Sequence, residues 1–92
     1  MRITDGTIER VRAAADIVDI VSGFVRLRKA GRNFVGLCPF HKEKTPSFNV
    51  NPERNIYKCF GCGKGGDPIG FIMDIESVSF LEAVEELADR YG

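Results

Sequence analysis

The sequence predicts a small α+β domain, in which a short antiparallel β-sheet is flanked by short helices at both ends of the chain. Apolar residues recur at helical spacing near both termini, whereas the middle of the chain alternates apolar and polar residues as strands do. A Cys-x-x-His pair and a Cys-x-x-Cys pair stand at the two ends of one predicted hairpin. The 92 residues make one domain, of a size at which a hydrophobic core alone gives marginal stability.

The first two predicted elements are short helices. Apolar residues follow helical spacing over 5–15, and Thr4 can cap the start of this helix. Asp16 is a second N-cap candidate, ahead of an apolar segment that Ser22-Gly23 would end. Both helices are expected to pack on the core.

Two β-hairpins are predicted next. Residues 24–28 alternate apolar and basic side chains, and residues 33–37 return from a turn. Residues 47–50 and 55–58 form the second hairpin, joined by the turn-rich sequence Asn-Pro-Glu-Arg.

The chain ends in two further predicted helices. After Gly65-Gly66, which we expect to be flexible, Asp67 can cap a helix that begins at Pro68, where the missing N–H costs nothing. Ser79 and Glu82 form a capping box for the final helix, which is acidic on one face and apolar on the other.

The pattern Cys38-x-x-His41, followed after seventeen residues by Cys59-x-x-Cys62, predicts a metal site. These four residues are all the cysteines and the only histidine of the chain. Each of these short Cys-containing turns is called a knuckle below. Two knuckles on either side of a hairpin can bring their ligands to the corners of one tetrahedron, the geometry of Zn²⁺ in closed structural sites. We therefore expect one structural Zn²⁺ at Cys38, His41, Cys59 and Cys62.

Other uses of these residues are disfavoured. Three cysteines would leave one thiol outside a disulfide, and no signal peptide indicates an oxidising compartment. Four protein ligands leave no open position for a catalytic zinc. Phosphoryl transfer needs clustered carboxylates beside basic groups, and the basic middle of the chain holds only Glu43 and Glu53 as acids. The sequence therefore predicts no catalytic residue.

The formal net charge is zero, but the charges are segregated along the chain. Residues 26–64 carry nine basic and two acidic side chains, a net charge of +7, whereas residues 1–25 have −1 and residues 65–92 have −6. The basic segment also holds five aromatic residues, Phe34, Phe40, Phe48, Tyr57 and Phe60. This combination is typical of surfaces that bind single-stranded nucleic acid. No apolar run is long enough to span a membrane, so we expect a cytoplasmic domain with no membrane partner.

The segments CPFHKEKTPSF and YKCFGCGKGGD, together with DIVDIV, RKAGRNF, FIM and FLEAVEELA, carry a family resemblance. Over nearly the whole chain, the sequence resembles the N-terminal zinc-binding domain of bacterial-type replicative DNA primase. It departs from the family's usual pattern at Lys58, where relatives often have histidine, and at Pro68, where an aliphatic residue is frequent. Neither position is a predicted metal ligand, so the departures leave the predicted zinc site unchanged.

The resemblance implies a zinc ribbon on the small antiparallel sheet, with residues 1–92 as the zinc-binding domain and a catalytic polymerase domain following in the parent protein. It implies a module that binds single-stranded template DNA, helps to select start sites and influences primer length. RNA primer synthesis with Mg²⁺ would belong to the polymerase domain, which lies outside these residues. The implied partners are template DNA, the polymerase domain of the same or another primase molecule, and the replicative helicase through a C-terminal domain.

Six residues are candidates for DNA contact. Arg28 and Arg32 match basic positions of the family's pattern and should bind phosphate, and Lys44 is the next candidate. The full set is Arg26, Arg28, Arg32, Lys44, Tyr57 and Lys58. Exposed rings would add roughly 1–3 kcal/mol per stacked base, but the sequence leaves open whether Tyr57, Phe34 and Phe48 are exposed or belong to the core.

Two other functions stay open at this point. The ribbon could serve protein contact, for example docking on its own polymerase domain, with a basic face that is merely solvated. The same ribbon would also suit a primase-helicase of a mobile element. Charge reversal at Arg28 and Arg32 separates the first two functions, because loss of DNA binding with intact domain docking supports DNA binding, and the opposite pattern supports protein contact.

Overall fold

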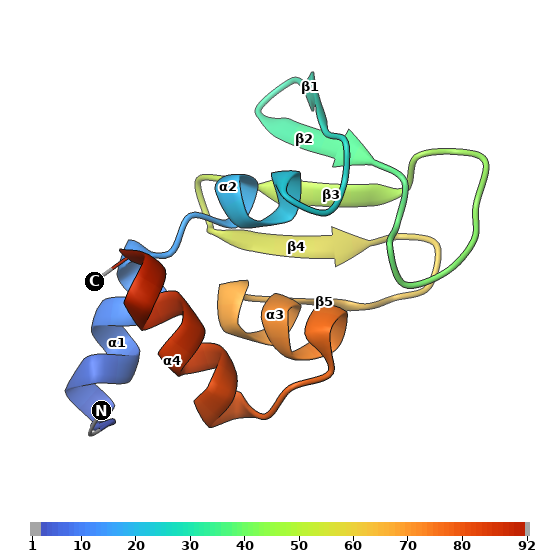
Figure 1. Cartoon of the computed structure of the whole chain (residues 1–92). Helices are drawn as coiled ribbons and strands as arrows, with labels where there is room; N and C mark the ends of the chain where they lie inside the picture. Colours follow the sequence, from blue (N-terminus) through green and yellow to red (C-terminus); the bar gives the residue numbers. More distant parts are fainter. Residues whose placement is uncertain (1–2, 92) are drawn as a thin grey trace.

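The computed structural model describes residues 3–91, over which helices flank a five-stranded antiparallel sheet (Figure 1). Two helices precede the sheet and two follow it, so the predicted α+β class is confirmed. The elements are α1 (Asp5–Ala14), α2 (Ile17–Ser22), β1 (Arg28–Ala30), β2 (Asn33–Gly36), β3 (Phe48–Asn51), β4 (Ile56–Cys59), β5 (Gly65–Gly66), α3 (Pro68–Glu76) and α4 (Phe80–Tyr91). None of the helices between residues 3 and 91 has the length and hydropathy needed to cross a bilayer.

The strands follow one another in the sheet in chain order, each antiparallel to the next. One cross-strand row runs through Arg28, Val35, Asn49, Lys58 and Gly65. The neighbouring row runs through Lys29, Phe34, Val50, Tyr57 and Gly66. Since register partners share a face and successive residues alternate, the two rows face opposite sides. The second row lies on the face packed against α2 and α3, and the first row lies on the open face.

The first hairpin begins later in the chain than the alternation over 24–28 predicts. The N–H groups of Phe24 and Val25 both bind the carbonyl of Val21, which continues the end of α2. Val25 is buried because it packs beside α2, and it is not part of a strand. The strand starts at Arg28, and Gly31, with φ of +65°, makes the turn.

The prediction that Gly65-Gly66 is flexible is also wrong, because these residues form β5 against β4. A Cβ on Gly65 would lie 3.0 Å from the carbonyl oxygen of Tyr57. The pairing of β5 with β4 therefore requires a residue without a side chain at position 65. An alternating pattern of apolar and polar residues cannot reveal such a close approach of two backbones.

An aromatic cluster forms the centre of the core. Phe48 and Tyr57 are neighbours on β3 and β4, and their rings stack with centroids 5.3 Å apart. Phe71 of α3 meets Tyr57 edge to face at 5.3 Å. Phe40 extends the cluster into the loop after β2, with its ring 5.8 Å from that of Phe71. Burial of each such side chain contributes about 1.5–3 kcal/mol, and the cluster joins the helices to the sheet.

The predicted helix caps are confirmed. Thr4, Asp16 and Asp67 accept hydrogen bonds from backbone N–H groups in the first turns of α1, α2 and α3. At the start of α4, the Ser79 hydroxyl accepts the N–H of Glu82 at 3.2 Å, and the Glu82 carboxylate accepts the N–H of Ser79 at 3.1 Å. These side chains satisfy N–H groups that have no partner within the helix.

The side chain of Asn55 links the β3–β4 turn to the junction of α1 and α2 through hydrogen bonds. Its φ is +58°, a left-handed conformation that asparagine tolerates better than most residues. Its Oδ1 accepts the N–H of Ile17 at 2.9 Å, and its Nδ2 donates to the carbonyls of Arg12 at 3.3 Å and Ala15 at 2.7 Å. One side chain thus replaces backbone pairing between segments about forty residues apart.

Replacing Asn55 by alanine should lower the free energy of unfolding by roughly 2–4 kcal/mol, because partly buried backbone groups lose their partners. Chemical denaturation of the metal-loaded chain measures this. As a control, Asn51→Ala removes a single exposed bond to the N–H of Arg54 and should cost about 1 kcal/mol or less. Equal losses in the two variants would contradict the role assigned to Asn55.

Candidate metal centre

The four predicted ligands come from two loops at one end of the sheet. Cys38 and His41 lie in the loop between β2 and β3, Cys59 is the last residue of β4, and Cys62 lies in the turn before β5. Phe48 pairs with Cys59, so the end of the first loop is held beside the start of the second turn. In Figure 1 both loops lie at the end of the molecule opposite α1.

The ligand atoms of Cys38, His41, Cys59 and Cys62 all lie within 4.8 Å of one another. The Sγ atoms of Cys38 and Cys62 are 3.9 Å apart, and Cys59 Sγ lies 4.0 Å from His41 Nδ1. Tetrahedral Zn²⁺ with Zn–S bonds of about 2.3 Å places its sulfur ligands roughly 3.8 Å apart. The arrangement therefore fits a four-coordinate zinc ion with little movement.

Both knuckles direct backbone N–H groups at sulfur. The N–H of Phe40 lies 3.3 Å from Cys38 Sγ, and the N–H of Gly61 lies 3.4 Å from Cys59 Sγ. A Cβ on Gly61 would lie 2.8 Å from His41 Nε2, so the second knuckle needs glycine there. These donors stabilise negative charge on thiolates, as sulfur bound to a metal ion requires.

The thiols differ in acidity in the metal-free fold. Burial raises the pKa of Cys38 to about 12, and the neighbouring thiols of Cys59 and Cys62 act in the same direction. Burial also raises the pKa of Cys59, but hydrogen bonds from the Cys62 N–H, the Ser47 hydroxyl and the Gly61 N–H outweigh it and lower the pKa to about 6. At pH 7 Cys38 is therefore protonated and Cys59 is largely thiolate.

A functional residue that the sequence analysis missed is Glu43, which lies in the first loop with its side chain 10% exposed. Its carboxylate accepts the N–H of Cys38 at 2.9 Å, the N–H of Ser47 at 3.1 Å and the Ser47 hydroxyl. It also lies 3.1 Å from His41 Nε2. Hydrogen bonding from Ser47 and from the Cys38 N–H lowers the pKa of Glu43, which keeps it ionised. The only signal in the sequence was an acid two residues after a ligand.

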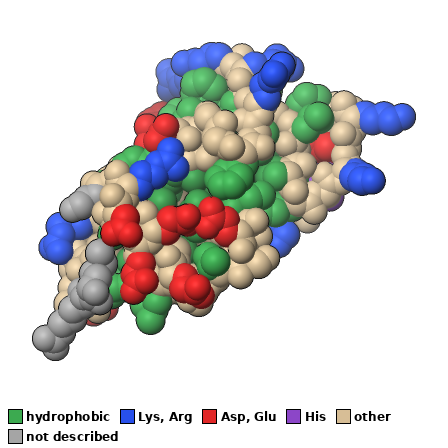
Figure 2. Space-filling model, in the orientation of Figure 1, with side chains coloured by type: hydrophobic (Ala, Val, Ile, Leu, Met, Phe, Trp, Pro, Cys, Tyr) green, Lys and Arg blue, Asp and Glu red, His purple; other side chains and the backbone are tan. Residues whose placement is uncertain are grey.

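The basic residues predicted for DNA contact are all exposed, and they occupy three regions. Arg26, Arg28 and Arg32 lie in and around β1, Lys58 lies on the open face of β4, and Lys44 lies in the loop between β2 and β3. Figure 2 shows Lys and Arg side chains along the upper and right-hand edges of the molecule, while Asp and Glu gather on the lower part of this face.

The prediction that Tyr57 contacts DNA is wrong. The residue is 2% exposed, and its hydroxyl donates to Asp74 at 3.2 Å. Strand alternation turns Tyr57 toward the helices, where its ring cannot offer a face to a base. Phe48 is fully buried and belongs to the core. Phe34 is half-buried, with Lys29 Nζ 5.4 Å from its ring centroid.

Phe60 is an exposed aromatic residue that was not among the six candidates for DNA contact. It is 72% exposed and stands between two predicted ligands, where a tight knuckle turns side chains outward. Phe60 and Lys58 border a hollow of about 520 Å³ on the open face of the sheet, and its lining also includes Asn33, Asn49 and Asn51. The Phe60 ring, the asparagine amides and the Lys58 ammonium group thus offer stacking, hydrogen bonding and positive charge on one surface.

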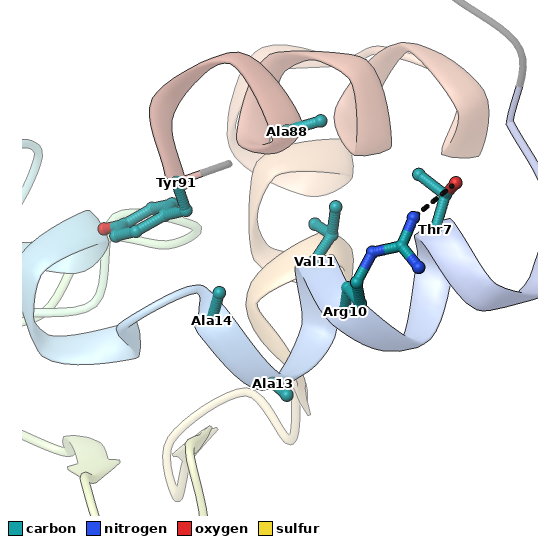
Figure 3. A pocket seen from close by; sticks show the side chains of 7 residues that line it. All are labelled: Thr7, Arg10, Val11, Ala13, Ala14, Ala88 and Tyr91. Atoms are coloured by element: carbon teal, nitrogen blue, oxygen red, sulfur yellow. Dashed lines mark hydrogen bonds between the residues drawn. The ribbon is translucent and has the colours of Figure 1, made fainter.

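A second hollow lies between α1 and α4, away from the metal centre (Figure 3). Alanines, Val11 and Tyr91 form most of its wall, while Arg10 and Thr7 stand at one side and contact each other at 3.4 Å. Among the described residues, no Cys, His, Asp or Glu side chain lines it. We assign no chemistry to it.

Comparison with known proteins gives one consistent result. The family model described as CHC2 zinc finger matches residues 3–92. A DNA primase of Geobacillus stearothermophilus is 54% identical over 91 residues, which cover 99% of this chain and 15% of that protein. A DNA primase of Listeria monocytogenes is 54% identical over 88 residues, covering 96% of this chain and 14% of that protein.

A solved structure agrees with the sequence matches. The crystal structure of the Aquifex aeolicus primase, comprising zinc-binding and RNA polymerase domains, resembles this chain with a TM-score of 0.89 and 50% identity. The match covers 94% of this chain and 21% of that one. The chain thus spans about 15% of the length of the curated relatives it matches. The zinc finger family model and the clustered Cys and His side chains together point to a structural zinc ion.

Zinc binding at pH 7 should release about one proton from Cys38, because its pKa of about 12 keeps the thiol protonated until the metal displaces the proton. Cys59, with its pKa lowered to about 6, should release fewer protons than Cys38. The apparent zinc affinity should therefore rise with pH. Calorimetric titrations in buffers of different ionisation enthalpy count the protons released.

The matched variant for this prediction is Cys38→Ser, which removes the thiol. It should release about one proton fewer than the parent chain when it binds zinc. A heat of binding that does not depend on the buffer, in the parent chain, would show that Cys38 is already a thiolate before the metal binds.

Proposed function

The chain belongs to the CHC2 zinc finger family, and from this premise we propose that it is the zinc-binding, template-binding module of a DNA primase. Cys38, His41, Cys59 and Cys62 would hold one structural Zn²⁺, which supplies a rigid cross-link between the two loops. The four protein ligands fill a tetrahedron, so the ion has no open position for substrate. We expect no catalytic residue in the module itself.

The parent protein would be a nucleotidyltransferase that synthesises short RNA primers at replication forks. The relatives are named DNA primase, and the Aquifex structure pairs a zinc-binding with an RNA polymerase domain. Residues 1–92 would be the zinc-binding domain, and the polymerase domain would follow with its Mg²⁺. Its partners would be that polymerase domain, in the same or another molecule, and the replicative helicase through the parent's C-terminal domain, all in the cytoplasm.

The observation that carries the template-binding proposal is the open face of the sheet. Arg28 and Lys58 lie in one cross-strand row, with Val35 and Asn49 between them. Arg26 and Arg32 extend the positive charge around β1, and this segment carries most of the net +7 of residues 26–64. Within residues 3–91 no helix packs on this row, so a single strand can lie across it with its phosphates on the basic side chains.

The same face supports a role in template selection. Asn33, Asn49 and Asn51 line the same hollow as the exposed Phe60. An amide can donate to and accept from the edge of one base, while a ring stacks on bases of any sequence. Start-site choice would come from the amides and affinity from the ring and cations. An effect on primer length would follow if the module keeps hold of the template while the polymerase domain extends the primer.

Charge reversal at Arg28 tests template binding. Arg28→Glu should weaken binding of the zinc-loaded chain to short single-stranded DNA and reduce the salt slope by about 0.7–1 for the lost phosphate contact. Fluorescence anisotropy at several salt concentrations measures both. The control is Arg10→Glu, which makes the same change of charge on exposed α1, remote from the open face. An equal effect of both variants would contradict a site on the sheet.

One observation favours protein contact as a second candidate function. Phe24 and Leu37 are 47% and 48% exposed and border an apolar hollow that Pro39 and Pro46 also line, with Arg26 and Arg28 at its edge. A partner with apolar and acidic side chains, such as the polymerase domain, would fit there. Arg28→Glu separates the candidates: lost DNA binding with intact docking supports the first, and the opposite result supports the second.

A further inference from the structure

We propose that Glu43 is a positioning residue of the metal centre, whose carboxylate fixes the ring of His41 so that Nδ1, and not Nε2, binds the metal ion. This inference rests on the proposed zinc site. Of the two ring nitrogens, Nε2 lies 3.1 Å from the Glu43 carboxylate, and Nδ1 faces the cysteine cluster, 4.0 Å from Cys59 Sγ. A ring whose Nε2–H is donated to a carboxylate presents its free electron pair at Nδ1.

The neighbouring residues restrict the orientation of the His41 ring. Gly61 lies directly against it, since a Cβ on this glycine would meet Nε2 at 2.8 Å and Cε1 at 3.0 Å. The side of the ring that carries Nε2 is therefore confined between Gly61 and Glu43. Turning the ring over about its Cβ–Cγ bond would exchange Nδ1 with Cδ2 and so withdraw the ligand nitrogen from Cys59.

Glu43 is itself held in place by the first loop. Its carboxylate accepts the N–H of Cys38 at 2.9 Å and the N–H of Ser47 at 3.1 Å, together with the Ser47 hydroxyl. Ser47 Oγ in turn lies 3.6 Å from Cys59 Sγ. One carboxylate thus contacts two ligand residues directly and a third through Ser47, so it can align the ligands before the ion arrives.

The chemical consequence is a better imidazole ligand. A carboxylate that accepts the distal N–H fixes the tautomer and raises the basicity of the nitrogen that binds the metal, and loss of such a partner costs about 10–100-fold in metal affinity. Glu53, by contrast, lies exposed in the β3–β4 turn and has no route to the metal centre. The two glutamates of the basic segment therefore have different roles.

The first test reads the tautomer directly in the parent chain. Long-range ¹H–¹⁵N correlation spectra of the zinc-loaded protein should show His41 bound through Nδ1 and protonated at Nε2, with the Nε2 proton protected from exchange. A spectrum in which Nε2 carries the metal would overturn the inference. Because no substitution is needed, this test does not depend on a variant that folds.

The second test measures zinc affinity by competition with a chelator. Glu43→Ala should weaken binding by about 10–100-fold, while Glu53→Ala should leave it unchanged. In a His41→Cys background, where the ligand has no second ring nitrogen, Glu43→Ala should cost much less. An equal loss in both backgrounds would mean that Glu43 acts only on the loop, which would overturn the inference. A parent chain that binds no zinc would overturn the proposed zinc site as well.

Discussion

The pairing of β3 with β4 is the constraint on which the rest of the structure depends. Their register places Phe48 opposite Cys59, so a core aromatic and a metal ligand stand side by side at the same end of the sheet. The loop that carries Cys38 and His41 leads into β3, and the turn that carries Cys62 leaves β4. One hairpin therefore decides both where the core forms and whether the two knuckles meet. The turn at its other end, held by Asn55, ties the same hairpin to the N-terminal helices.

The parts of the fold that depend on local chemistry could be predicted from the sequence. Caps at Asp16 and Asp67 and the capping box at Ser79 are short-range interactions, which a sequence displays directly. The Cys and His spacing is equally local within each knuckle. Only the meeting of the two knuckles is a long-range event, and it follows from a hairpin whose turn residues are also visible in the sequence.

The errors share a different cause, because each depended on what lies across a strand or loop. Val25 fits a strand pattern but packs beside α2, and nothing local distinguishes the two environments. Tyr57 was kept as a candidate for DNA contact because a sequence does not show which face of the sheet the helices cover, and the structure buries it. Glu43 was counted only as a charge, since its four partners come together only after the loop has folded. Burial and hydrogen bonding between segments are thus what the sequence pattern left undetermined.

The two borders of the sheet differ from its interior in a way that bears on solubility. β1 is exposed at all three residues and carries Arg28 and Lys29, while β5 is two glycines long and packs against α3. The charges on β1 and the short length and helical cover of β5 leave neither edge strand open to pairing with an apolar strand of a neighbouring copy. Several copies of the domain can therefore lie close together without their sheets joining into aggregates.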